Sequence, residues 1–181
     1  MMKFVLIATV SILSTLVPGL AQPDLTPRAT VIRPEIAILL KQDFPDRNFR
    51  TTIAEVSFTN GAHEVLTLLG FNLPPCTGAC TVSFSDALAA NGTRMLQLFR
   101  MIGYPGPSDT YNHKPPVDVY LGSFLVPPTG TGPATVVEGF EPTLGCPATT
   151  TKYGLFVRSR FGDDNYVTWD ITKGGFIITC S

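Results

Sequence analysis

The sequence predicts an all-β protein, an antiparallel β-sandwich of about nine strands. Apolar and polar residues alternate with a period of two over most of residues 30–181, which is typical of strands that bury one face. The 16 glycines and 16 prolines, together with Asn and Asp, separate these segments in the way that turn residues do. Twelve Phe, five Tyr and one Trp supply the bulky side chains that a core needs.

Residues 1–21 have the composition of a secretory signal peptide. Basic Lys3 precedes an apolar run that ends at Leu16, and the small residues Gly19 and Ala21 stand just before a cleavage site at Gln22. The run is too short to cross a bilayer, so we expect cleavage, export from the cell and no membrane span in the mature protein. The rest of the chain divides into an N-terminal extension, residues 22–29, and one domain, residues 30–181.

The strands follow in order along this domain. Residues 34–41 and 94–102 contain helix formers but also alternate, and we predict both as strands. Residues 53–59 alternate, Asn60-Gly61 marks a tight turn, and residues 65–71 are almost continuously apolar, which predicts a hairpin with a well-buried second strand. The other predicted strands are residues 80–85, with Cys80, Val82 and Phe84 facing the core, and residues 117–126, 134–140, 152–158, 165–171 and 175–180.

A long loop is expected at residues 104–116, because four prolines leave no room for a regular element. Long loops on a sandwich often carry binding surfaces. Exposed aromatic rings bind sugars well, so Tyr104, Tyr111 and Tyr120 form a candidate ligand surface. Trp169 alternates with other apolar residues and is expected in the core.

The net charge and the spacing of possible metal ligands restrict what the protein can bind. The chain has 13 basic and 14 acidic residues, a formal net charge of −1, which argues against nucleic acid. We expect an unidentified protein or polysaccharide partner outside the cell. No cofactor and no metal are expected: a zinc site needs two closely spaced pairs of ligands, but only Cys76 and Cys80 form such a pair, and neither His63 nor His113 belongs to one.

Two kinds of covalent modification are expected of an exported chain. Asn91-Gly92-Thr93 is an N-glycosylation sequon, which makes Asn91 a candidate glycosylation site. An even number of cysteines in an exported protein predicts two disulfides, and the sequence leaves three pairings open. The four residues are Cys76, Cys80, Cys146 and Cys180.

Motifs that would indicate an enzyme are missing from the sequence. It contains no Gly-x-Ser-x-Gly elbow of an esterase and no His-Glu-x-x-His of a zinc protease. Ser108, Asp109 and His113 lie close together in the proline-rich loop, but a catalytic triad requires a rigid scaffold, and we interpret them as polar loop residues. The sequence therefore predicts no catalytic residues and favours a non-catalytic binding module.

Paired carboxylates support an alternative, a secreted hydrolase acting on polysaccharide. Such enzymes need two carboxylates about 5 to 10 Å apart across a cleft. Glu138 and Glu141 flank Phe140, and Asp163 and Asp164 stand in an expected turn. Strand placement and turn chemistry explain both pairs without catalysis, so we expect them to be scattered and not to converge on one cleft.

The order of several short motifs resembles the But-two C-terminal domain family of fungal proteins. These motifs are CTVSF at residues 80–84, DTYN at 109–112, LGSF at 121–124, GCP at 145–147, Asp170 and GFII at 175–178. The resemblance runs over most of the mature chain, roughly residues 30–180, and implies a secreted β-sandwich from an ascomycete, with no catalytic residues to transfer. The family is named for binding an activating enzyme of a ubiquitin-like modifier, an intracellular partner that an exported protein would not ordinarily meet.

The cysteines of that family carry over to Cys80 and Cys146. The family's Pro-Cys-Pro before the last strand is replaced here by residues 171–174, and Cys180 follows near the end of the sequence. Of the three pairings we prefer Cys76 with Cys80, which closes a short loop, and Cys146 with Cys180, which joins strand ends expected to be neighbours.

Overall fold

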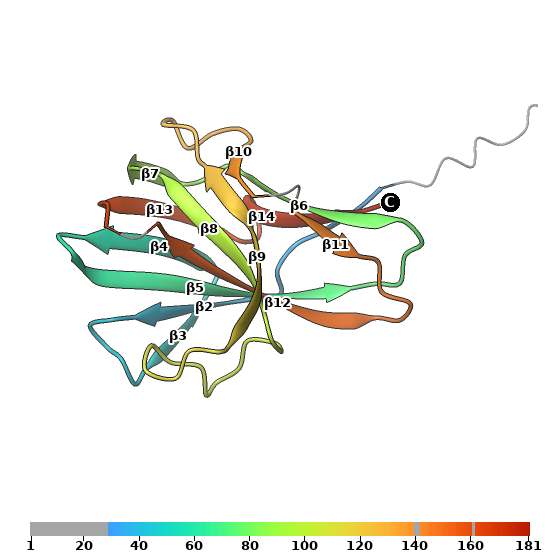
Figure 1. Ribbon diagram of the computed structural model, residues 1–181, viewed down its shortest axis with the longest axis horizontal. Helices are drawn as coiled ribbons and strands as arrows, with labels where there is room; N and C mark the ends of the chain where they lie inside the picture. Colours follow the sequence, from blue (N-terminus) through green and yellow to red (C-terminus); the bar gives the residue numbers. More distant parts are fainter. Residues whose placement is uncertain (1–28, 140–141, 161) are drawn as a thin grey trace, which may run out of the picture.

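The computed structural model describes residues 29–139, 142–160 and 162–181, and within these residues every regular element is a β-strand (Figure 1). Four strands form the smaller sheet: β1 (Thr30–Ile32), β6 (Ala79–Ser85), β11 (Thr143–Gly145) and β14 (Gly175–Cys180). Ten strands form the larger sheet: β2 (Ile36–Lys41), β3 (Asn48–Thr51), β4 (Ile53–Thr59), β5 (Ala62–Leu73), β7 (Ala89–Gly92), β8 (Met95–Met101), β9 (Val117–Leu125), β10 (Thr135–Glu138), β12 (Thr151–Ser159) and β13 (Asn165–Asp170).

The two sheets confirm the predicted all-β antiparallel sandwich. The smaller sheet has the order β1-β14-β6-β11, and the larger has the order β10-β9-β8-β12-β5-β4-β13-β7, with β2 and β3 attached beside β5. In Figure 1, β6 and β11 lie toward the right, and most strands of the larger sheet spread toward the left, while the end of β5 and the start of β12 reach the right below β11. The described residues form fourteen strands where the sequence predicted about nine, because four strands of three or four residues escape the alternation pattern.

The main core lies between the two sheets. Trp169, predicted as a core residue, is fully buried and packs edge-on against Phe84, with ring centroids 5.4 Å apart. Phe176 continues this aromatic packing, 4.9 Å from Phe84 and 5.2 Å from Phe124. Strand β6 alternates as predicted, with its even-numbered residues buried.

Strand β5 is buried on both faces, in agreement with its apolar sequence. It pairs with β2, β4 and β12, and residues 64–71 are all buried. Residues on the face away from the main core form a second apolar group with β2, β8 and β12. This second cluster consists of Ile38, Leu40, Leu66, Leu68, Met101 and Phe156, with Ile36, Phe99 and Tyr111 packed against it. The larger sheet is therefore covered on both sides over β5.

Both disulfides form, but the preferred pairing was wrong. The structure joins Cys76 to Cys146 and Cys80 to Cys180. Cys80 and Cys180 are direct cross-strand partners on β6 and β14. Strand β6 lies between β14 and β11, so the strand ends that carry Cys146 and Cys180 are not the neighbours that the preferred pairing requires.

The predicted strands and the predicted loop are confirmed where the structure describes them. The ambiguous segments 34–41 and 94–102 form β2 and β8, and residues 53–71 form the β4–β5 hairpin. Residues 102–116 contain no strand. The predicted signal peptide, all but the last residue of the extension, and Phe140 and Glu141 lie outside the described residues.

Candidate functional site

The loop of residues 102–116 folds over the second cluster on the outer face of the larger sheet. Its base is closed by a hydrogen bond from the Ile102 amide to the Pro116 carbonyl, at 2.8 Å. The first residue of β3 holds its middle: the Asn48 side-chain amide donates to the Gly106 and Pro107 carbonyls at 3.3 and 2.7 Å. The Asn112 side chain donates to Asp46, at 2.8 Å. The loop is therefore fixed to the sheet at several points.

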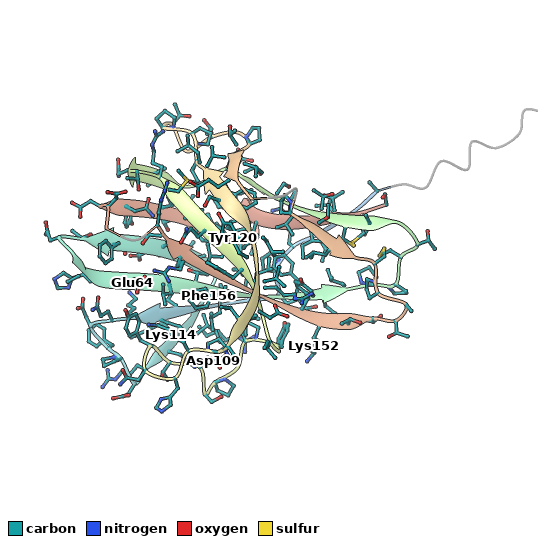
Figure 2. The ribbon with its side chains drawn as sticks, viewed as in Figure 1. Glu64, Asp109, Lys114, Tyr120, Lys152 and Phe156 are labelled. Carbon is teal, nitrogen blue, oxygen red and sulfur yellow. A yellow bond between two sulfur atoms is a disulfide. The ribbon has the colours of Figure 1, made fainter. Side chains whose placement is uncertain are left out.

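Four polar residues, which we call the Glu64 cluster, tie the C-terminal part of the loop to the sheet: Glu64, Tyr111, Lys114 and Arg158. The Tyr111 hydroxyl donates to the Glu64 carboxylate at 2.7 Å, and an Arg158 nitrogen lies 4.0 Å from the other carboxylate oxygen. The Lys114 ammonium lies 3.4 Å from the centroid of the Tyr111 ring, a close cation–π contact. Figure 2 shows Glu64 and Lys114 on the same side of Phe156.

Burial shifts the pKa values of two members of this cluster, Tyr111 and Lys114. It raises the pKa of the Tyr111 hydroxyl, and the hydrogen bond to Glu64 raises it further, so this tyrosine remains a donor at neutral pH. Burial lowers the pKa of the Lys114 ammonium, while the Glu64 carboxylate opposes that shift. Only 10% of the Glu64 side chain is exposed, so its carboxylate finds its hydrogen bond and its ion pair inside this cluster.

Removing the Tyr111 hydroxyl tests whether this cluster holds the loop. Tyr111→Phe keeps the ring but leaves a buried carboxylate without its closest donor, and we expect a loss of about 2 kcal/mol in the free energy of unfolding. Urea denaturation measures this loss. Tyr166→Phe, which removes a hydroxyl from an exposed ring, serves as the control and should cost less than about 0.5 kcal/mol. Equal stability of the two variants would contradict the assigned role.

A half-open hollow of about 500 Å³ lies at the other end of the loop, between it and strands β2, β3 and β12. Tyr104 forms part of its wall together with Pro105 and Pro107. The Tyr104 ring lies directly over Gly70 of β5, where a Cβ would come within 2.6 Å of the ring. A side chain at this position would push the tyrosine off the sheet, so the glycine allows the wall to form.

Charged side chains surround the hollow. Lys152 and Arg50 line it with Asn48, and Glu35 contributes a carboxylate. The Lys152 ammonium lies 5.1 Å from the Tyr104 ring centroid, and the Tyr104 hydroxyl donates to Glu35 at 3.4 Å. Burial raises the pKa of Tyr104, and the negative charge of Glu35 adds to the rise. The hollow therefore offers an aromatic ring, uncharged donors and both signs of charge to a ligand.

The three tyrosines expected to form one ligand surface have separate surroundings. Tyr104 lines the hollow, whereas the hydroxyl and one ring face of Tyr111 are engaged in the Glu64 cluster. Tyr120 packs on Phe99 with ring centroids 5.2 Å apart, and its hydroxyl lies 2.6 Å from the Ser123 hydroxyl. In Figure 2 Tyr120 lies above Phe156, while Lys114 and Lys152 lie below it.

The polar triplet of the loop serves local structure. The Asp109 carboxylate accepts a hydrogen bond from the Gly106 amide at 2.8 Å. His113 contacts the Thr110 hydroxyl at 3.3 Å, and Ser108 is exposed on the loop. His63, beside the β4–β5 turn, is also exposed and pairs with a neighbouring aspartate.

The carboxylates considered for hydrolysis belong to different parts of the structure. Glu138 of β10 forms an ion pair with Arg160 at 3.1 Å. Asp164 accepts a hydrogen bond from the Asn60 amide at 2.7 Å, and Asp163 is exposed in the same turn. Among the described residues that line the hollow, Glu35 has the one carboxylate, and it is not among the carboxylates considered for hydrolysis.

Sequence reasoning missed most of the residues that build these sites. Asn48, Arg50 and Lys152 come from two strands, and no local pattern connects them. Glu64 carried a signal that could have been used, because it is an acidic residue that directly precedes an apolar run predicted to be buried. A charge in that position needs a partner, and the tyrosine-containing loop supplies it.

Sulfur atoms form the one group of metal-ligating atoms found in the described part of the chain. Those of Cys76, Cys80 and Cys180 lie within 4.8 Å of one another. Each belongs to a disulfide, so none of them is a thiolate that could bind a metal.

Comparisons with known proteins do not assign a family. The chain matches no protein-family model, and no curated protein matches its sequence significantly. A search of the described residues for a helix long and apolar enough to span a membrane finds none.

Proposed function

We propose that this protein is a secreted, non-catalytic binding module and that it binds a carbohydrate in the hollow beside Tyr104. The hollow itself is the observation that carries the proposal. Its volume of about 500 Å³ falls in the range of small-ligand sites. An aromatic ring, two prolines and several polar side chains around one hollow suit a sugar, whose rings have apolar C–H faces and hydroxyls at their edges.

Export is supported by chemistry that belongs to an oxidising compartment. Two disulfides stabilise the smaller sheet, and such bonds persist outside the reducing cytosol. The signal-like residues 1–21 and the Asn91 sequon favour the same compartment. The order of the short motifs resembles that of the But-two C-terminal domain family. We therefore also propose that the protein is a divergent fungal member of that family.

Replacing the tyrosine ring tests the proposed site. We expect the secreted protein to be retained on at least one of insoluble glucan, chitin and cellulose. Tyr104→Ala should weaken this retention at least about tenfold, because aromatic side chains in a binding hollow usually contribute more than other contacts. The measurement is a depletion isotherm for each polysaccharide.

Two controls separate binding from folding. Tyr104→Phe keeps the ring over Gly70 and should retain most of the binding, and a thermal unfolding scan of each variant checks that it remains folded. If the wild-type protein were retained on none of the polysaccharides, carbohydrate binding would be the wrong assignment. If Tyr104→Ala bound as well as the wild type while folded, the ligand site would lie elsewhere.

A further inference from the structure

The sequon at Asn91 occupies an open edge of the larger sheet. It lies at the end of β7, the last strand in the sheet order, and β7 pairs with β13. Ala90 points into the main core, so Asn91 points to the opposite face, where it is exposed. Because its side chain is exposed to solvent, it is accessible to modification.

An exposed tyrosine stands directly opposite this asparagine. Tyr166 of β13 is the cross-strand partner of Asn91. Directly opposite residues in an antiparallel pair have Cβ atoms about 5 Å apart and share one face. The Tyr166 side chain is 39% exposed, and together with Asn91 it lines a shallow depression of about 120 Å³ that also includes Thr59 and Asp164.

The other two residues of the sequon have structural roles of their own. Gly92 has a φ of +69°, and a Cβ there would come within 2.2 Å of the Asp164 carbonyl oxygen. The Thr93 amide donates to that carbonyl at 3.0 Å, and its hydroxyl lies 3.4 Å from the Asn165 side-chain oxygen. The fold thus explains Gly92 and Thr93, and only Asn91 and its aromatic neighbour point to a sugar.

We propose that Asn91 carries an N-linked glycan and that the apolar face of its first N-acetylglucosamine packs on the Tyr166 ring. In the modification, the Asn91 Nδ2 atom loses a proton and bonds to the anomeric carbon of a lipid-diphosphate-linked oligosaccharide. The bond from that carbon to the phosphate oxygen breaks, and the lipid diphosphate leaves with the bonding electrons. This inference rests on the proposed export, because the donor is found in the secretory pathway.

Packing on the ring makes the glycan part of the folded structure. The C–H face of the sugar and the face of the phenol exclude water from each other, as aromatic and apolar cross-strand pairs do. The glycan should therefore stabilise the protein when Tyr166 is present and lose that effect when the ring is removed. A glycan that merely projects into solvent would show no dependence on Tyr166.

Four forms of the full chain, secreted from a eukaryotic host, test this inference: the wild type, Asn91→Gln, Tyr166→Ala and the double variant. Intact mass before and after N-glycosidase treatment should show one glycan on the wild type and on Tyr166→Ala, and none on the other two. The midpoint of thermal unfolding is then measured for each form. Tyr166→Ala should lower it by about 3 °C more in the glycosylated background than in the Asn91→Gln background.

Each result has one interpretation. A secreted wild-type protein without the mass shift would refute modification at Asn91, and equal effects of Tyr166→Ala in both backgrounds would refute packing on the ring. Retention of the whole protein inside the host cells would instead refute the proposed export. Tyr166→Phe keeps the ring and should preserve the glycan-dependent stabilisation, so its failure to do so would also contradict the inference.

Discussion

Loss of the Cys80–Cys180 disulfide should remove about 4 kcal/mol from the free energy of unfolding. This bond joins residues 100 positions apart, so it restricts the unfolded chain strongly. The variant to measure replaces both cysteines, Cys80→Ala and Cys180→Ala. A single substitution would leave a free thiol next to the second disulfide, because the Cys76 sulfur lies 3.5 Å from the Cys80 sulfur, and that thiol could exchange with the remaining bond. Guanidinium denaturation of the wild type and the double variant measures the difference.

Removing the other bond provides a matched comparison. Cys76→Ala with Cys146→Ala opens a loop of 70 positions and should cost a similar amount. Tryptic digestion of the unreduced protein distinguishes this pairing from the one preferred on sequence grounds, Cys76 with Cys80 and Cys146 with Cys180. Cys76 and Cys80 stay on one peptide because no Lys or Arg lies between them, so the structure requires that peptide to be linked to both the Cys146 and the Cys180 peptides. A Cys146 peptide linked directly to the Cys180 peptide would contradict it.

Gly175→Ala should destabilise the protein by at least about 3 kcal/mol, because it combines backbone strain with a collision in the core. Gly175 has a φ of +83°, and a Cβ there would lie 1.9 Å from Cδ1 of the Trp169 ring. That ring is fully buried among phenylalanines and has no space to move away. Since Trp169 is the one tryptophan of the chain, its fluorescence reports unfolding directly.

Gly61→Ala separates strain from collision. Gly61 has a similar φ of +73°, but nothing lies within 4 Å of the position where a Cβ would be added. This control should therefore cost about 1 to 2 kcal/mol, from backbone strain alone. A Gly175→Ala variant no less stable than Gly61→Ala would mean that the tryptophan does not pack on this glycine.

Alternation predicted most of the longer strands, and an almost continuous apolar run predicted β5. In residues 80–85 and 175–180 the buried and exposed sides can be assigned over several residues, and both segments form strands with those bounds or within one residue of them. Strands β1, β3, β7 and β11 have three or four residues, too few for a period of two to be distinguished from a loop. These short strands form by pairing with a longer strand beside them in the sheet.

Relations between distant segments could not be read from local patterns. The pairing of the cysteines depends on β6 lying between β14 and β11, which is a property of sheet order and not of sequence spacing. The hollow likewise requires that β2, β3 and β12 meet the 102–116 loop. Tyr104 could be predicted as a ligand residue because it is an aromatic residue in a long, proline-rich loop. Arg50 and Lys152 could not, because in the sequence they resemble ordinary exposed charges on strands.

The anchoring of the 102–116 loop bears on how ligand preference could evolve. Asn48 and the Glu64 cluster hold the aromatic wall in place, so a ligand does not have to order the loop when it binds. Arg50 and Lys152 project from strands whose backbones are already paired, and exposed side chains of this kind can be exchanged at little thermodynamic cost. Related sequences could thus acquire new specificities by changing two charges while inheriting the same scaffold.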